Sequence, residues 1–404
     1  MKSSVAVFVL ATHLALTVPT AAQVSGGVVR IGVLNDQSGI FADLGGQGSV
    51  IAARMAVEEA GGTVLGKPVE IIVGDHQNKP DTGSAIARGW IDTQGVDAIF
   101  DVPASATAIA VQDVTRDKNK MLFLSGPGSS DFTGKRCSPT TVHWTYDSYA
   151  DANGTARALV KQGGDTWFFL TADNAGSHAQ EQDATGFVKR AGGTVVGAVR
   201  HPFATHDFSS FLLRAQSSGA KVIGLANAGT DTITSVKQAR EFGITSGGQK
   251  LASLLMFITD IHAIGLEDAQ GLVFTDSFYW DMDDQTRAWS RRFMERHGGR
   301  APTSVQAGVY GAVRHYLKAV AAAGTDETTA VARKVKELPV EDFWSAGFKI
   351  RQDGRLVRDM YLFQAKAPSE SKGTWDYYKV LAKIPGDEAF RPVSEGSCPL
   401  VNQN

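Results

Sequence analysis

Three short segments of this chain, each rich in hydroxyl side chains or in glycine, could hold a small anion. They span residues 38–46, 103–107 and 126–130, and each follows an apolar run of strand length. Backbone N–H groups and hydroxyls at the start of a helix form a natural cradle for a carboxylate. Ordinary helix capping is the simpler explanation for any one segment taken alone. Three such segments on adjacent strands favour a binding site.

Patterns typical of catalysis do not occur. The sequence has no Gly-x-x-x-x-Gly-Lys-Ser/Thr motif and no Gly-x-Ser-x-Gly elbow, and residues 44–48 lack the spacing of the dinucleotide fingerprint. His201 and His206 are five apart and form no zinc-binding pair. The acids at 281, 283 and 284 lack the later ligands of a calcium loop and suit a helix N-terminus instead. We therefore predict a protein that is not an enzyme and uses no metal or cofactor.

The composition is that of an ordinary globular chain. Of its 404 residues, 43% are hydrophobic and 20% are charged, and the formal net charge is −2. This length exceeds one small domain and suits two lobes. The near-neutral balance gives no electrostatic footprint for nucleic acid or for anionic lipid.

Residues 1–22 have the parts of a secretory signal peptide. Lys2 is followed by an apolar run over 5–18, and small residues then precede Gln23, so cleavage is expected after Ala22. A buried N-terminal helix is the alternative. The run is shorter than the ~20 residues that span a bilayer. No cysteine lies near the cleavage point, so we expect no lipid anchor.

Cys137 and Cys398 are the only cysteines of the chain. Export would place them in an oxidising compartment, where an even count favours a disulfide. Such a bond would tie the C-terminal tail to the loop near residue 139. Two unpaired thiols too far apart to bond remain the alternative.

Strands and helices alternate along most of the chain. One series of apolar strands and helices runs from 28 to 125 and a second from 149 to 275. Helical patterns then fill 283–338, and a hairpin is predicted around Asp353-Gly354. Alternation of this kind implies parallel sheets, so we predict an α/β fold with two doubly wound parallel-sheet lobes. Ligands of such sheets bind at the carboxyl ends of the strands.

The order of several short motifs resembles the Leu/Ile/Val-binding type of periplasmic binding protein. The resemblance covers nearly all of residues 28–382, and its order and spacing are more specific than any single motif. The motifs are an opening strand and loop at 31–39, Ile-Ile-Val-Gly-Asp at 71–75, Ala-Ser-Ala-Thr at 104–107, an Asp-containing loop within 169–176, and Asp-Phe-Ser at 207–209.

The resemblance implies a type I periplasmic binding fold with three crossover strands, near 144–146, 275–278 and 343–347. Lobe one would then comprise 28–145 and 278–343, lobe two 146–277 and 344–390, and the tail 391–404. It also implies a periplasmic, monomeric protein that closes on a small molecule and delivers it to the permease and ATPase subunits of an ABC importer. A sensing protein of the same fold that acts on a separate signalling partner is the alternative.

For lobe one, the resemblance implies a ligand carboxylate held by the hydroxyl loop of Ser105 and Thr107 and by a second loop at Gly128 and Ser129. Ala104 stands where the family often has a contacting serine. Leu44 replaces an aromatic lid residue, for which Phe41 is a substitute nearby.

For lobe two, Asp173 falls near the acid that holds an α-amino group, although that loop otherwise departs from the family pattern. Asn227, Gly229, Asp231 and Asp260 fall at later strand ends that contact the ligand. Tyr279, within the aromatic trio 278–280, could also face the cleft, although packing at the lobe interface is favoured. We expect a carboxylate-bearing ligand, either an amino acid or an aromatic acid.

Overall fold

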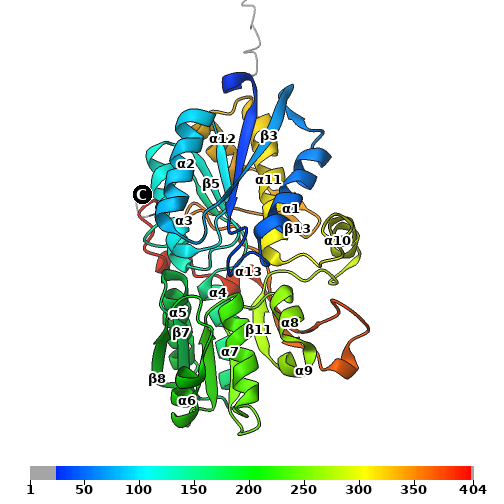
Figure 1. The fold of residues 1–404 in the computed structure, drawn as a ribbon. Coiled ribbons are helices and arrows are strands. Elements are labelled where there is room, and N and C mark those ends of the chain that lie inside the picture. Colours follow the sequence, from blue (N-terminus) through cyan, green and yellow to red (C-terminus); the bar gives the residue numbers. More distant parts are fainter. Residues whose placement is uncertain (1–23, 402–404) are drawn as a thin grey trace, which may run out of the picture.

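The computed structural model describes residues 24–401 and consists of two lobes (Figure 1). Each lobe is built on one sheet with helices on its faces, so the predicted fold class is confirmed. One lobe lies above the other in Figure 1, and the chain visits each lobe more than once, as the sequence of colours shows.

Lobe one contains a six-stranded sheet in the order β2-β3-β1-β4-β5-β6. Its central strand β1 pairs in parallel with β3 and β4. β1 is buried along nearly its whole length, as expected for a parallel strand covered on both faces. The strands are β1 (Val29–Asn35), β2 (Thr63–Val64), β3 (Lys67–Asp75), β4 (Ala98–Asp101), β5 (Met121–Leu124) and β6 (Thr141–His143). The helices are α1 (Gly46–Glu59), α2 (Pro80–Gln94), α3 (Ser105–Asp117), α10 (Asp284–Arg296), α11 (Ser304–Ala323) and α12 (Thr328–Glu337).

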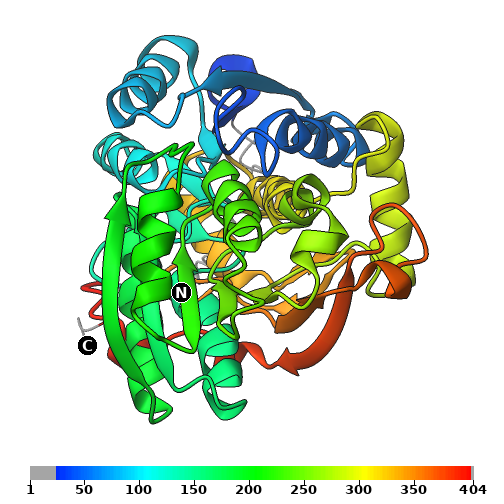
Figure 2. The same ribbon diagram turned by 60° about the horizontal axis from the view of Figure 1, so that its bottom comes forward.

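Lobe two contains a seven-stranded sheet in the order β15-β14-β11-β10-β9-β7-β8, with separate apolar clusters packed on it. Figure 2 turns this lobe toward the viewer. Its first five strands along the chain pair in parallel, whereas β14 and β15 add an antiparallel edge. The strands are β7 (Thr166–Ala172), β8 (Thr194–His201), β9 (Val222–Ala226), β10 (Lys250–Ser253), β11 (Val273–Asp276), β14 (Met360–Ala365) and β15 (Tyr378–Ile384). The helices are α4 (Ser148–Lys161), α5 (Ala175–Arg190), α6 (Ser209–Ser217), α7 (Thr230–Glu241), α8 (Ile258–Ile264), α9 (Leu266–Ala269) and α13 (Gly386–Ala389).

Three crossovers join the lobes, at 144–147, 277–283 and 357–359. The first two overlap the predicted 144–146 and 275–278, but the third lies later than the predicted 343–347. Phe343 stacks on Trp289 of α10 with ring centroids 4.2 Å apart, and Ile350 and Leu356 belong to the lobe-one core. A short hairpin, β12 (Val340–Asp342) with β13 (Ser345–Phe348), keeps this stretch on lobe one. Lobe one therefore extends to about 356 rather than to 343.

Two local predictions are corrected by the structure. Within the second predicted series, the apolar run at 254–258 indicates a strand, but the strand lies at Lys250–Ser253 instead, because Asp260 accepts the Phe257 N–H at 2.9 Å and starts α8 there. The hairpin expected around Asp353-Gly354 is reduced to one bridge between Ile350 and Leu356. β14 pairs with β15 instead.

Cys137 and Cys398 form a disulfide, which confirms that prediction. The predicted signal peptide lies outside the described residues. Within residues 24–401, no helix has both the length and the apolar composition needed to cross a membrane.

Candidate functional site

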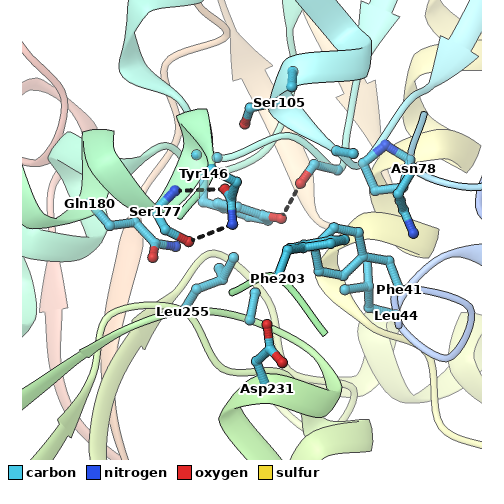
Figure 3. A pocket seen from close by; sticks show the side chains of 18 residues that line it. Phe41, Leu44, Asn78, Ser105, Tyr146, Ser177, Gln180, Phe203, Asp231 and Leu255 are labelled. Carbon is cyan, nitrogen blue, oxygen red and sulfur yellow. Dashed lines mark hydrogen bonds between the residues drawn. The ribbon is translucent and has the colours of Figure 1, made fainter. Parts of the chain in front are cut away.

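A cavity of about 200 Å³ lies between the two lobes, at the carboxyl ends of the strands (Figure 3). Since liquid water occupies roughly 30 Å³ per molecule, this space suits a small solute. Lobe one contributes Phe41, Leu44, Asn78, Pro103, Ala104, Ser105, Ala106, Gly126 and Gly128. Tyr146, in the first crossover, also lines the cavity. Lobe two contributes Asn174, Gly176, Ser177, Gln180, Phe203, Ala228, Asp231 and Leu255.

The start of α3 is the strongest anion-binding feature of the cavity. Its N-cap residue, Ala104, has no side-chain acceptor, so no side chain caps the first turn. Ala104, Ser105 and Ala106 all line the cavity. The first N–H groups of a helix have no partner within the helix and carry the positive end of its dipole. They can therefore hold a carboxylate without any cationic side chain.

The strand end before α3 has an unusual backbone that brings two loops together. Asp101 and Val102 both have positive φ values, 85° and 52°. A Cβ at Gly126 would lie 2.5 Å from the Cα of Pro103, so only glycine permits this approach of the two loops. Asp101 is fully buried, accepts a hydrogen bond from Asn35 at 3.0 Å, and has its pKa raised to about 6 by burial.

One side of the cavity is apolar and is formed by both lobes. Phe41 of lobe one meets Phe203 of lobe two edge to face, with ring centroids 5.7 Å apart. Leu44 and Leu255 complete this wall. Aromatic contacts of this kind contribute about 0.5–1.5 kcal/mol beyond burial, so the pair also helps to hold the lobes together.

The lobe-two wall carries amides, a hydroxyl and one acid. Asn174 caps α5 by accepting the Ser177 N–H at 3.0 Å. The Oε1 atom of Gln180 is buried and has no hydrogen-bond partner among the described residues. Asp231 accepts the N–H groups of Ala204 at 3.2 Å and Thr205 at 2.8 Å, and burial raises its pKa to about 6. The residues that line the cavity include no Lys, Arg or His.

The lobes are in contact across the cavity, which is a closed arrangement. Gly176 at the start of α5 lies so near Ser105 that an added Cβ would be 2.9 Å from the Ser105 hydroxyl. Gly229 has a φ of +59°, and its Cβ would be 2.3 Å from the carbonyl oxygen of Ile40. Both glycines therefore permit close inter-lobe contact.

Six of the residues singled out from the sequence line the cavity: Phe41, Leu44, Ala104, Ser105, Gly128 and Asp231. Two more lie directly behind this wall. The Ser129 N–H donates to the Ser105 hydroxyl at 3.3 Å, while its own hydroxyl accepts the Asp131 N–H. Thr107 is buried in α3, with its methyl group against Gly83 of α2.

Of the lobe-two residues singled out from the sequence, Asp231 lines the cavity and the others do not. Asp173 is exposed and bonds His178 at 2.9 Å. Asn227 is buried and accepts from Thr232 at 2.8 Å. Gly229 contacts Ile40 instead, as described above.

Asp260 and Tyr279 also lie away from the cavity. Asp260 is a buried cap of α8, and burial raises its pKa to about 7. The Tyr279 hydroxyl donates to the Trp375 carbonyl oxygen at 3.2 Å, and its ring stacks on Tyr378. Tyr279 is therefore packed in the lobe-two core, as the favoured alternative has it, and does not line the cavity.

Several lining residues were not singled out from the sequence, namely Asn78, Tyr146, Asn174, Ser177, Gln180, Phe203 and Leu255. Asn174 could have been identified from the sequence, because asparagine is a preferred N-cap residue and Asn174 directly precedes α5. Gln180 lies one further turn along α5 on the side that faces the cavity. Phe203 and Leu255 had no local signal, because only the closed arrangement brings them to the cavity.

Comparison with known proteins gives consistent matches. The family model described as "Periplasmic binding protein" matches residues 28–374. The crystal structure of a periplasmic binding protein from Burkholderia mallei is 49% identical and has a TM-score of 0.91, covering 93% of this chain and 99% of its own. A branched chain amino acid ABC transporter periplasmic ligand-binding protein from Burkholderia xenovorans is 41% identical, with a TM-score of 0.82 and coverage of 92% and 99%. A curated relative, "Leu/Ile/Val-binding protein homolog 6" of Brucella melitensis, is 27% identical over 289 residues, which are 70% of this chain and 72% of the relative.

Proposed function

Because this chain belongs to the periplasmic binding protein family, we propose that it is the substrate-binding component of an ABC-type importer and traps a small carboxylate-bearing solute between its lobes. Its fold and its relatives are those of solute-binding proteins, not of enzymes. The 41% identical relative from Burkholderia xenovorans is named for branched-chain amino acid transport, which supports the importer assignment.

The observation that carries the carboxylate proposal is the uncapped start of α3 at the cavity wall. A carboxylate there would accept hydrogen bonds from backbone N–H groups and from Ser105. The rest of the ligand would lie between the apolar wall of Phe41, Leu44, Phe203 and Leu255 and the polar wall of lobe two. An amino acid or an aromatic acid fits a cavity that has one apolar wall and one polar wall. Asp231 and the free acceptor of Gln180 favour a ligand that also bears an N–H or O–H donor.

The closed arrangement indicates how the solute would be trapped, namely by closure of lobe two over a solute held on lobe one. A solute held first by lobe one gains its contacts with Asn174, Gln180 and Asp231 only when lobe two closes. A ligand that contacts both lobes only in the closed form shifts the population towards that form. The closed protein would then dock on the permease, and we propose export to the periplasm with cleavage after Ala22.

A thermal-shift screen of the mature protein tests the ligand class. Each carboxylate is paired with its carboxamide, for example leucine with leucinamide and benzoate with benzamide. A solute that binds only the folded protein raises its unfolding temperature by mass action. We expect a shift with at least one carboxylate and a much smaller shift with its amide, because the amide lacks the negative charge that the α3 dipole favours. Equal shifts for both members of each pair would remove the carboxylate from the proposal.

The importer assignment is tested by reconstitution with the permease and ATPase subunits of a candidate importer. Ligand-loaded protein should stimulate ATP hydrolysis above the rate seen with the ligand-free protein. No stimulation by any bound solute would favour a sensing role with a separate partner.

A further inference from the structure

The C-terminal segment 385–398 runs from lobe two back to lobe one and crosses the junction between them. It leaves the lobe-two sheet at the end of β15, and α13 then packs on α4 at the level between the lobes (Figure 1). The Asn153 side chain of α4 donates to the carbonyl oxygens of Glu388 at 2.6 Å and Ala389 at 3.1 Å. The first part of the segment is thus fixed to lobe two.

The next residue is anchored at the first crossover. Phe390 is buried, and the guanidinium of Arg355 lies 4.4 Å from its ring centroid. The same guanidinium donates to the carbonyl oxygens of Thr145 at 2.7 Å and Tyr146 at 3.2 Å. Through Arg355, the segment is therefore linked to the first crossover, where lobe one passes into lobe two.

Arg391 then connects the two lobes through polar groups. Its guanidinium donates to the Ser130 hydroxyl of lobe one at 2.6 Å and to the Asp183 carboxylate of α5, in lobe two, at 3.2 Å. The Ser130 hydroxyl in turn donates to Asp183 at 2.8 Å. The side chains of Arg391 and Asp183 are only 20% and 11% exposed, so water screens this ion pair weakly. Charge-assisted hydrogen bonds of this kind are among the stronger ones in proteins.

The end of the segment is attached covalently to lobe one. Cys398 is bonded to Cys137, which follows the lobe-one turn at Ser130–Thr133 and is 261 residues earlier in the chain. The segment also lies close against that loop, because a Cβ at Gly134 would be 2.7 Å from the carbonyl oxygen of Gly396. The disulfide thus closes a path from the lobe-two sheet to lobe one that is separate from the three crossovers.

We propose that segment 385–398 is a fourth connection between the lobes, in which Arg391 is a positioning residue that favours the closed form and the disulfide keeps the segment in place. A rotation that separates Ser130 from Asp183 breaks the Arg391 bridge, so the segment limits how far the lobes open. This proposal rests on the lobe closure of the proposed function but not on the identity of the ligand.

The test is small-angle X-ray scattering from the ligand-free mature protein, with the radius of gyration as the readout. Arg391→Ala and the double variant Cys137→Ser/Cys398→Ser should each shift the radius of gyration to a larger value, because more molecules are open. Arg391→Lys should restore part of the closed population, since it keeps a charge near Asp183. The matched control is Lys379→Ala, which removes an exposed ion pair with Glu370 confined to lobe two and should leave the scattering unchanged.

A wild-type radius of gyration in both Arg391→Ala and the disulfide variant would overturn the proposal. So would an equal increase in Lys379→Ala. Circular dichroism establishes that each variant is folded, and Ser130→Ala replaces Arg391→Ala if the latter is not, since it also interrupts the bridge. Because no ligand is present, failure of the carboxylate proposal would not change these outcomes.

Discussion

Ser105 is the residue at which the two lobes and the cavity meet. Its hydroxyl accepts the Ser129 N–H, lies beside Gly176 of lobe two, and faces the space at the start of α3. The sequence identified Ser105 because a serine at a helix start after a buried strand is a marked pattern. The family resemblance instead chose Asp173 in lobe two, whereas the adjacent Asn174 is the residue that caps α5 and lines the cavity. Which of two neighbouring polar residues turns inward depends on the backbone at the strand end.

Replacing Ser105 and Ser129 separately should distinguish a ligand contact from a structural one. Ser105→Ala should weaken binding of the best carboxylate by about 1–3 kcal/mol, the range for a hydrogen bond to a charged group. Ser129→Ala should leave the affinity unchanged and lower the free energy of unfolding by up to about 1 kcal/mol, because it removes a cap. Calorimetric titration and denaturant unfolding measure the two effects. The reverse pattern would place the ligand against the other loop.

Asp231 should make stability depend on pH. Its pKa is raised to about 6 by burial, so the folded protein holds this proton more tightly than the unfolded chain. Stability from this group is therefore highest at low pH and is lost as the pH rises from about 4 to 6. Relative to Asp231→Asn, the wild type should lose up to about 3 kcal/mol between pH 4 and pH 7. Urea unfolding of both proteins at each pH measures this difference, and a constant difference would mean that Asp231 is not desolvated.

At the scale of elements, most strands and helices were predictable from local patterns, and their long-range partners were not. The alternation of strands and helices placed α3 and its loop correctly, since both signals are local. The third crossover was misplaced because Phe343 packs on Trp289, a contact that no local pattern reveals. No local pattern shows what Tyr279 packs against either, since Trp375 and Tyr378 reach it from near β15, about a hundred residues later.

The loop before α7 should be a sensitive point for closure. Gly229→Ala would place a methyl group 2.3 Å from the Ile40 carbonyl oxygen when the lobes meet. We expect at least a tenfold loss of affinity for the best carboxylate, because the closed form carries this clash and the open form does not. Gly219→Ala is the control, since its φ is +66° but nothing lies within 4 Å of the added atom. It should cost stability alone, and an equal loss of affinity in both variants would show that closure is not the cause.

At the scale of the whole molecule, the cavity is a product of two sheets facing each other. The two-lobed fold followed from the length, the repeated alternation and the resemblance, and the structure and the comparisons bear it out. The detailed site did not follow, because Phe203, Leu255 and Gln180 reach the ligand space only when lobe two closes on lobe one. The C-terminal segment adds a further connection. The two cysteines predict its disulfide to lobe one, but they do not predict the bridge made by Arg391.

The most direct test of the central claim is a crystal structure of the mature protein with the carboxylate that gives the largest thermal shift. We predict that the ligand lies between the lobes, with its carboxylate at the first-turn N–H groups of α3 and within hydrogen-bond distance of Ser105. A ligand bound outside this cavity, or bound in it with its carboxylate directed away from α3, would contradict the account.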